Sequence, residues 1–277
     1  MKNKILELVK SNAQISIYFE ELLFAGTIEK EYPELFILTQ TPQEPTWHPE
    51  GNVWNHTLMC IDAAAKLIRR EELDEDDALV ILLGALCHDF GKPATTEFID
   101  GRIRSLGHEE AGEMPTRSFL DKIGVDGIIC EKIVNLVKNH LIPHHFYENI
   151  FDRKMKVSDS AFHRLAKRIY PATMYELALV AEADHLGIGP FLSEEDQNKT
   201  LIRVEDPAAA WFLEKWNEIK STENIKADNA ISGKKLIELG FSPGPEFKKI
   251  IEIANKLRDE EGLNKAEIIE RIINMKK

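Results

Sequence analysis

Apolar residues recur every three or four positions along most of this chain, and this spacing constrains its fold more than any other feature. In residues 53–70, one face carries Leu58, Ile61, Ala64, Ala65 and Ile68. A helix places such residues on a single stripe, which is typical of an amphipathic helix packed on a core. The same spacing predicts helices over residues 5–23, 73–87, 107–120, 128–140, 160–170, 172–186 and 208–220.

One stretch has the pattern of a β-hairpin. Residues 98–103 read Phe-Ile-Asp-Gly-Arg-Ile, and an Asp-Gly pair favours a tight hairpin turn. The stretch is too short to build a sheet that is stable by itself. The sequence therefore predicts an all-α fold.

Helix-breaking stretches divide this pattern into three segments. Residues 41–49 are rich in proline, and residues 187–207 lack helical spacing. Because proline and glycine interrupt helices, we expect an N-terminal helical segment over residues 1–45, a main body over residues 46–206 and a small helical C-terminal tail over residues 207–277. Within that tail, Asn264 and Glu267 have the spacing of a capping box at a helix start.

The charge balance limits the class of partner. The 277 residues include 35 Lys and Arg against 47 Asp and Glu, for a net charge of −12. Proteins that bind nucleic acid nonspecifically neutralise phosphates with a basic surface, so the balance argues against that class. It still allows a local site that holds one phosphate through a metal ion.

Cysteine usage and hydropathy indicate the compartment. Cys60, Cys87 and Cys130 show no CxxC spacing, which argues against a disulfide framework and a thiolate zinc site and favours a reducing compartment. The longest nearly unbroken apolar run, residues 78–87, is shorter than the ~18 residues of a membrane span. The charged first turns do not form a signal peptide. We therefore expect a cytoplasmic protein without a membrane partner.

Several polar side chains fall where the helical pattern requires apolar ones. His88 and Asp184 lie on the apolar stripes of their expected helices, with Asp89 next to His88 at the helix end. His56 and His140 continue two other stripes. Taken singly, an inward histidine is usually a hydrogen-bonded core residue, and an inward aspartate can cap a helix or pair with an arginine. Together they favour a divalent-cation site, because a buried carboxylate is normally paired or bound to metal.

These residues resemble a known signature. His56, then His88-Asp89, then Asp184 resemble the H...HD...D pattern of the HD superfamily of metal-dependent phosphohydrolases. Residues 47–57, WHPEGNVWNHT, are similar to the HPEGDVWTHT segment of bacterial tRNA nucleotidyltransferases (CCA-adding enzymes) with a C-terminal HD domain. Residues 181–184 and 231–246 are similar to the EAD segment and the ISGxDL...LGxxPGPE tail of those enzymes. The resemblance covers about residues 15–255 and implies an HD-domain helical bundle.

The sequence also departs from that family. The polymerase head of the family carries a Gly-Ser turn followed by paired metal-binding aspartates on a strand, and this sequence lacks that pattern. Residues 74–76, Asp-Glu-Asp, have the letters of the pair but begin an expected helix. CCA addition by this chain alone is therefore not expected. Asn52 stands where the family usually has Asp, and Lys248 stands where its tail usually has Gly.

The resemblance implies roles for individual residues. The expected ligands of one divalent cation, which could be Mn, Ni, Co, Fe, Mg or Zn, are His56, His88, Asp89 and Asp184. Asp89 would bridge to a second cation held by His108 and His140. The expected catalytic residues are Asp89 and Lys92, and the expected substrate contacts are Lys92, His144 and His48. Alternatives stay open, because His108 and His144 also suit exposed positions, Lys92 a helix cap and His48 a turn stabiliser.

The implied reaction is the attack of a metal-bound hydroxide on a phosphoester. The family resemblance suggests activity of the 2',3'-cyclic phosphodiesterase, 2'-nucleotidase or phosphatase type, and the acidic composition favours small nucleotides or a tRNA or other RNA end. Nucleoside triphosphates and signalling nucleotides stay open as substrates. The alternative is a non-catalytic module that binds metal or nucleotide and partners a separate nucleotidyltransferase or tRNA. The complete ligand set argues against this alternative.

Overall fold

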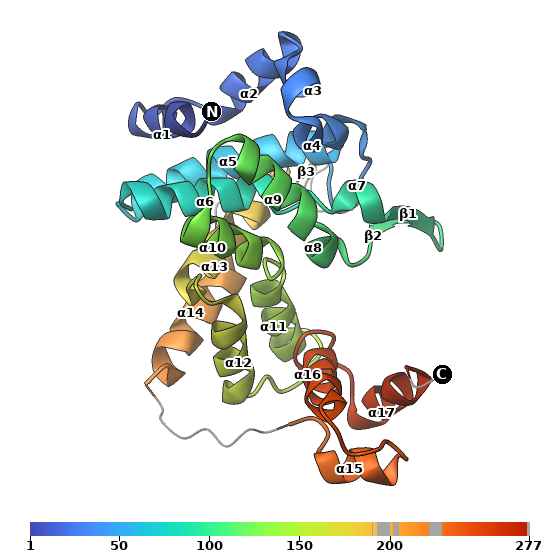
Figure 1. The fold of residues 1–277 in the computed structure, drawn as a ribbon. Coiled ribbons are helices and arrows are strands. Elements are labelled where there is room, and N and C mark those ends of the chain that lie inside the picture. Colours follow the sequence, from blue (N-terminus) through green and yellow to red (C-terminus); the bar gives the residue numbers. More distant parts are fainter. Residues whose placement is uncertain (190, 193–199, 202–204, 222–228, 276–277) are drawn as a thin grey trace. The chain divides into compact units, whose positions relative to one another are not determined.

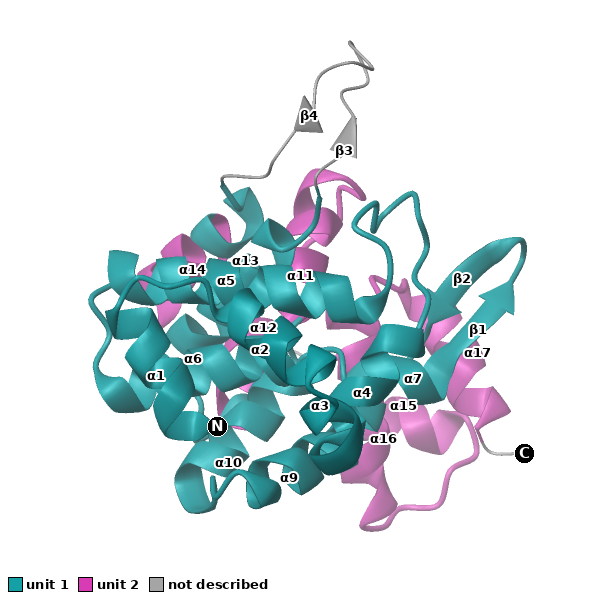
Figure 2. Ribbon diagram, turned by 90° about the horizontal axis from the view of Figure 1, so that it is seen from above, with its two compact units in different colours: residues 1–140, 169–210 teal, residues 141–168, 211–277 magenta. Residues whose placement is uncertain are grey.

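The computed structural model describes residues 1–189, 191–192, 200–201, 205–221 and 229–275 (Figure 1). Nearly all regular structure in these residues is helical, so the all-α prediction is confirmed. The chain divides into two compact units (Figure 2). The first comprises residues 1–140 and 169–210, and the second comprises residues 141–168 and 211–277.

The first unit holds most of the helices. They are α1 (Lys2–Lys10), α2 (Ile15–Phe24), α3 (Thr27–Glu31), α4 (Pro33–Phe36), the 3-10 turn η1 (Ile37–Gln40), α5 (Val53–Arg70), α6 (Glu75–Cys87), α7 (Lys92–Thr95), α8 (His108–Ala111), α9 (Glu113–Lys122), α10 (Gly127–Val137) and α13 (Met174–Leu186). Two short antiparallel pairs, β1 (Thr96–Ile99) with β2 (Arg102–Ser105) and β3 (Phe191–Leu192) with β4 (Thr200–Leu201), complete the unit.

The first unit is built around α6, in which every residue from Ala78 to Cys87 is buried. A helix that is apolar on all sides needs neighbours on all sides, and α6 contacts α1, α5, α10 and α13. At its start, the Asp74 side chain accepts a hydrogen bond from the backbone N–H of Asp77 at 3.0 Å. Acidic residues suit this end of a helix dipole, so the interpretation of residues 74–76 as a helix start is confirmed.

Side-chain caps fix where α5 and α13 begin. Asn52 accepts a hydrogen bond from the backbone N–H of Asn55 at 3.0 Å. At α13, Thr173 and Glu176 cap each other: the Thr173 hydroxyl accepts from the Glu176 N–H at 3.1 Å, and Glu176 accepts from the Thr173 N–H at 2.7 Å. Because α5 begins at Val53, His56 lies in its first turn. Asp184 lies in the last turn of α13, and α13 packs against α5.

The N-terminal helices share the first unit with α5 and α6. Ile5 and Phe19 are buried, and Asp62 on α5 accepts hydrogen bonds from the Ile15 N–H at 2.8 Å and the Ser16 hydroxyl at 2.6 Å. The two units therefore do not divide at residues 45 and 206, where the breakers suggested segment boundaries. As domain boundaries, those positions stay a prediction.

Local differences from the expected elements have local causes. The stretch with a hairpin pattern does form one, and its turn residues Asp100 and Gly101 both have positive φ, at 51° and 79°, as this turn requires. The helix expected over residues 107–120 is two helices, α8 and α9. Pro115 has no N–H to donate to the Ala111 carbonyl across that junction. The loop expected over residues 187–207 lies partly outside the described residues.

The second unit contains two apolar clusters. Its elements are α11 (Ile142–Phe151), most of α12 (Asp159–Ile169), α14 (Pro207–Ile219) from residue 211, α15 (Gly233–Glu238), α16 (Glu246–Asp259) and α17 (Lys265–Asn274). Phe146, Phe162 and Phe212 pack on one another, and Trp211 packs against Phe162, so that tryptophan packs within the unit. The helical tail has its own core, formed by Ile231, Leu236, Ala254, Leu257, Ile268 and Ile272. The Asn264 capping box is confirmed at the start of α17.

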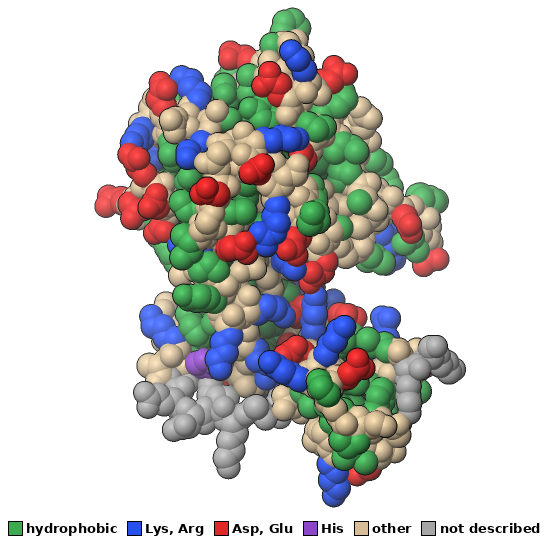
Figure 3. Space-filling model, viewed as in Figure 1, with side chains coloured by type: hydrophobic (Ala, Val, Ile, Leu, Met, Phe, Trp, Pro, Cys, Tyr) green, Lys and Arg blue, Asp and Glu red, His purple; other side chains and the backbone are tan. Residues whose placement is uncertain are grey.

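One face of the first unit is mixed in charge (Figure 3). On the face drawn in Figure 3, Lys and Arg side chains are interspersed with Asp and Glu over its helices. Among the described residues, no helix combines the length and the apolar character needed to cross a membrane.

Candidate metal centre

Six ionisable side chains from separate parts of the first unit meet in its interior. They are His56 on α5, His88 and Asp89 directly after α6, His108 at the start of α8, His140 shortly after α10, and Asp184 on α13. All are buried except Asp184, whose side chain is 14% exposed. The structure thus brings together every residue that the sequence assigned to metal binding.

A first group gathers around the α5–α13 contact. Nε2 of His56 lies 2.9 Å from Oδ1 of Asp184 and 3.3 Å from Nε2 of His88. Nε2 of His88 lies 3.6 Å from the same Asp184 oxygen. Cys60, one turn after His56, belongs to this group, since one ligand atom from each of the four side chains lies within 4.8 Å of the others.

A second group is formed by Asp89, His108 and His140, whose ligand atoms also lie within 4.8 Å of one another. Nε2 of His108 lies 3.4 Å from Nε2 of His140 and 3.5 Å from Oδ1 of Asp89. The other oxygen of Asp89, Oδ2, lies 3.2 Å from Nε2 of His88 and 3.8 Å from that of His56. Asp89 therefore presents one oxygen to each group.

Three of the histidines are oriented by backbone carbonyls. Nδ1 of His88, His108 and His140 lies 2.7, 2.8 and 2.7 Å from the carbonyl oxygens of Ala85, Ser105 and Val137, respectively. A carbonyl can only accept, so each Nδ1 carries the proton and donates it. In a neutral ring, Nε2 then carries a lone pair directed into the cluster, as in histidines that bind metal.

The second group is short of donors. Burial lowers the pKa of His108, and it lowers that of His140 to about 4 with the help of the neighbouring His88 charge, so both rings are neutral at neutral pH. Their Nε2 lone pairs face each other at 3.4 Å, and a carboxylate oxygen stands beside them. Buried acceptors without a donor between them are costly. A cation among them would satisfy all three.

The first group carries charge in the absence of a metal. Burial opposes ionisation of Asp184, yet the charges on His88 and His56 hold the pKa of its carboxyl well below the usual range. Burial also opposes a charge on His56, but its contacts with Cys60, Asp184 and Glu50 raise its pKa well above the ordinary value. The proton on His56 thus lies beside Asp184, where a bound cation would replace it.

Asp89 is only partly satisfied by the protein. Burial opposes its ionisation, and the charges of His88 and Lys92 hold the pKa of its carboxyl well below the usual range. Lys92 Nζ lies 2.7 Å from Oδ2 but is not aligned for a hydrogen bond, and that buried oxygen accepts none. The Lys92 ammonium donates instead to Oε1 of Gln43 at 2.6 Å. It therefore lies inside the cluster, at the start of α7, and does not cap the end of a helix.

The donor set fits a divalent transition metal. Imidazole nitrogens and carboxylate oxygens, with one oxygen lacking a hydrogen bond, suit Mn, Fe, Co, Ni or Zn better than Mg, which prefers oxygen ligands alone. The residues therefore form clusters that could hold a metal ion.

Gly91 allows the His108 turn to approach the turn that carries Asp89. A Cβ built on Gly91 would lie 1.9 Å from the His108 carbonyl oxygen and 2.6 Å from the Gly112 nitrogen. No side chain fits in that space, so glycine is needed for the second group to form.

The remaining predicted residues lie in different places. Nδ1 of His48 lies 2.7 Å from Oε1 of Glu50, which also accepts a hydrogen bond from Nδ1 of His56 at 2.9 Å. His48 is thus next to the first group, and its ring centroid lies 4.8 Å from that of His56. His144 lies on α11 in the second unit and is half-buried. Its role as a substrate contact stays a prediction.

Sequence reasoning did not assign Glu50, Gln43 or Cys60 to the metal centre. The sequence did contain a signal for Glu50, because this residue stands in the segment 47–57 that carries the family resemblance. Cys60 also had one, because its position four residues after His56 puts both side chains on one face of α5. Gln43 lies 49 residues before Lys92, and no local pattern indicates that contact.

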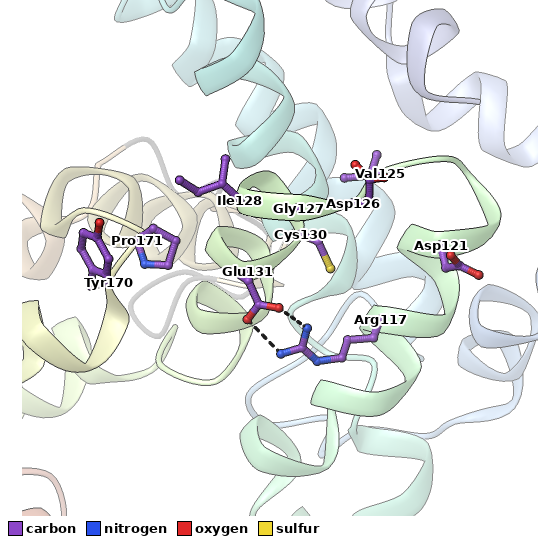
Figure 4. A pocket seen from close by; sticks show the side chains of 10 residues that line it. All are labelled: Arg117, Asp121, Val125, Asp126, Gly127, Ile128, Cys130, Glu131, Tyr170 and Pro171. Carbon is purple, nitrogen blue, oxygen red and sulfur yellow. Dashed lines mark hydrogen bonds and ion pairs between the residues drawn. The ribbon is translucent and has the colours of Figure 1, made fainter.

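A surface pocket elsewhere in the first unit holds none of these residues. It has a volume of about 430 Å³ and lies between α9, α10 and the turn before α13 (Figure 4), lined by Arg117, Asp121, Val125, Asp126, Gly127, Ile128, Cys130, Glu131, Tyr170 and Pro171. Arg117 crosses it to Glu131 through two hydrogen bonds of 2.5 and 3.0 Å. This pocket therefore lies apart from the buried cluster of metal-ligand side chains.

Comparison with known proteins gives the same region a family. Residues 53–186, from the start of α5 to the end of α13, match the HD domain. Curated relatives include multifunctional CCA proteins from Mannheimia succiniciproducens, 29% identical over 187 residues, and Xanthomonas campestris pv. campestris, 30% identical over 210 residues. These alignments cover 68% and 74% of this chain but only 42% and 47% of the relatives, so the chain spans less than half of their length. The fold, the clustered residues and these matches together identify residues 53–186 as an HD domain.

Proposed function

We propose that this protein is a metal-dependent phosphohydrolase that acts on nucleotides or on phosphoesters at RNA ends. The observation that carries the proposal is the position of Asp89, whose two oxygens face two separate groups of ligand atoms. Membership of the HD superfamily supports hydrolysis of phosphoesters. The resemblance to the HD region of tRNA nucleotidyltransferases supports nucleotides or RNA ends as the substrate class.

The clustered side chains form two sets, and each set would hold one cation. His56, His88, Asp184 and Oδ2 of Asp89 would hold the first, and Oδ1 of Asp89, His108 and His140 would hold the second. A divalent cation bound by such ligands lowers the pKa of a coordinated water and polarises a phosphoryl oxygen. Four imidazoles held by hydrogen bonds at Nδ1 need no reorientation to bind it.

Lys92 supplies a local positive charge at the cluster of a protein whose net charge is negative. The chain carries a net charge of −12, so a phosphate is attracted by local groups rather than by the whole surface. The Lys92 ammonium is held within the cluster by Gln43 and Asp89. There it offsets negative charge on a phosphate and keeps Asp89 ionised in the metal-free protein.

A substrate panel tests the proposal. Chelator-treated protein is supplied with each of Mn, Ni, Co, Fe, Mg and Zn and assayed with 2',3'-cyclic AMP, 2'-AMP, an aryl phosphate, dNTPs and guanosine tetraphosphate. We expect hydrolysis of the first three substrates. The rate should fall at least about a hundredfold in Asp89→Ala and Asp184→Ala, because losing a metal ligand lowers activity at least as much as losing a residue that is hydrogen-bonded to a ligand. Asp121→Ala, an exposed aspartate outside the cluster, is the matched control and should retain activity.

Each other outcome has a defined meaning. Full metal-dependent hydrolysis by Asp89→Ala would refute the proposed centre. Activity confined to dNTPs and guanosine tetraphosphate would replace the proposed substrate class. Co-purification with a nucleotidyltransferase, without hydrolysis of any phosphoester, would support a binding module instead of an enzyme.

A further inference from the structure

Cys60 lies within the first group of ligand atoms. It is on α5, one helical turn after His56, and is fully buried. Its Sγ lies 3.3 Å from Nε2 of His56 and 3.8 Å from the carbonyl oxygen of Asp184. Sγ and the ligand atoms of His56, His88 and Asp184 all lie within 4.8 Å of one another. The thiol therefore faces the point toward which the other three side chains are directed.

The end of α13 holds the thiol in this position. A Cβ built on Gly187 would lie 2.3 Å from Cys60 Sγ and 2.8 Å from the Cys60 nitrogen. Only a glycine lets the chain after Asp184 pass so close to α5. Such packing restricts Cys60 to a narrow space next to His56.

An independent observation indicates that a cation belongs here. Oδ2 of Asp89 is buried, lies 3.2 Å from His88 Nε2 and 3.8 Å from His56 Nε2, and accepts no hydrogen bond. The Lys92 ammonium lies 2.7 Å from this oxygen, but no hydrogen bond reaches it, and a metal ion would supply a ligand bond there.

We propose that Cys60 is a thiolate ligand of the cation held by His56, His88 and Asp184. The proposal rests on the proposed function, because it requires that group to bind a metal. On binding, the S–H bond breaks, the proton passes to solvent and the sulfur bonds to the cation, as thiol ligands do. A thiolate favours Zn, Co, Ni and Fe over Mg and Mn, so Cys60 determines which metals the centre selects.

The structural alternative is that Cys60 only fills space. Cysteine is among the most buried residue types and packs as a small apolar side chain. In that case the sulfur keeps its proton when metal is bound and makes only a weak contact with the Asp184 carbonyl oxygen, 3.8 Å away. The two roles differ in a single measurable property, which is a bond between sulfur and metal.

Cobalt substitution tests for that bond. Metal-free wild-type protein, Cys60→Ser, Cys60→Ala and the control Cys130→Ser are titrated with Co²⁺ and followed by absorption spectroscopy. We expect a thiolate-to-cobalt charge-transfer band in the near ultraviolet for the wild type and Cys130→Ser only. All four proteins should retain the visible cobalt bands. The affinity of both Cys60 variants for Co²⁺ should fall about tenfold or more, because even the loss of a residue hydrogen-bonded to a metal ligand has an effect of that size. Their Mn²⁺ affinity should change less than their Co²⁺ affinity.

Failure of this proposal can be distinguished from failure of the proposed function. Visible bands without a charge-transfer band in the wild type would overturn the role of Cys60 and leave the metal centre intact. A band that persists in both Cys60 variants, or disappears in Cys130→Ser, would assign the sulfur ligand elsewhere. No cobalt binding by the wild type would overturn both proposals. The wild-type spectrum is decisive even if a Cys60 variant fails to fold.

Discussion

Oε1 of Glu50 accepts a hydrogen bond from Nδ1 of His56 at 2.9 Å, so a carboxylate outside the expected ligand set orients one member of that set. The same oxygen accepts from Nδ1 of His48 at 2.7 Å, and Oε2 accepts from the Gly189 N–H at 3.2 Å. Burial opposes ionisation of Glu50, but the hydrogen bonds from His48 and His56 lower its pKa to about 2. Glu50 is therefore a charged acceptor at all pH values at which the protein would work.

Replacing Glu50 by glutamine should weaken metal binding without removing a ligand. A glutamine side chain has a single acceptor oxygen, so it cannot satisfy both imidazoles and the backbone N–H as the carboxylate does. We expect the affinity for the first cation to fall about 10- to 100-fold, the usual cost of losing a partner of a metal ligand. Calorimetric titration with Mn²⁺ or Zn²⁺ measures it. Glu97→Gln, an exposed residue on β1, is the control, and equal affinities for the two variants would contradict the orienting role.

Periodicity predicted the elements that build the site. The apolar stripes of α5, α6 and α13 are local features, and a polar residue on such a stripe must point inward. His88 and Asp184 could therefore be placed in the interior before any contact was known. Whether they meet depends on how the helices pack, and the spacing alone does not contain that information.

The contacts that complete the site are non-local. Gln43 reaches Lys92 across 49 positions, and Gly187 closes on Cys60 because two helices meet at that point. The absence of CxxC spacing argued against a thiolate site, but that pattern detects only cysteines that lie near one another in the sequence. Cys60 is the only cysteine in its group and is joined there by His56 of the same helix and by His88 and Asp184 from other parts of the chain, so no Cys–Cys spacing marks it.

Gly91→Ala should disrupt the second group of ligands and spare the first. An added Cβ would lie 1.9 Å from the His108 carbonyl oxygen, so the turn that carries His108 must move away from Asp89. We expect a destabilisation of about 1–3 kcal/mol, as for overpacking in general, and a loss of one bound cation of two. Thermal unfolding and metal analysis of dialysed protein measure these effects. Gly244→Ala, where the added carbon meets open space, should change neither, and two retained cations in Gly91→Ala would contradict the assignment of His108.

Glu34 should give the protein a pH-dependent increment of stability. On α4, it accepts hydrogen bonds from the Ser118 hydroxyl at 2.6 Å and the Lys122 ammonium at 2.7 Å, both on α9. Burial opposes ionisation, but these bonds lower the pKa of Glu34. A lowered folded-state pKa adds stability above the ordinary pKa near 4.3, and this stability is lost as the pH falls through the folded-state value.

Glu34→Gln should therefore be less stable than the wild type by about 0.5–1 kcal/mol at pH 7, since the partly exposed pair is screened by solvent. The difference should shrink below about pH 4, where the wild-type carboxyl takes up its proton. Urea unfolding at a series of pH values measures it, with the exposed Glu29→Gln as control. An equal difference at pH 3 and pH 7 would show that the carboxylate charge is not the cause.

Lys92→Met should make the stability of the protein depend on bound metal. Lys92 Nζ lies 2.7 Å from Oδ2 of Asp89, so it is the nearest positive charge to a carboxylate that has no hydrogen bond at that oxygen. Removing one partner of a buried ion pair costs about 3–5 kcal/mol, because the other charge stays buried and unpaired. A divalent cation at Asp89 would supply the missing charge, so the variant should unfold at a lower temperature than the wild type after chelator treatment and recover most of the loss with Mn²⁺. Hydrolysis should still be impaired, because the variant lacks the ammonium that we propose offsets charge on the phosphate. A loss of stability that is the same with and without metal would mean that Lys92 and the cation do not share Asp89.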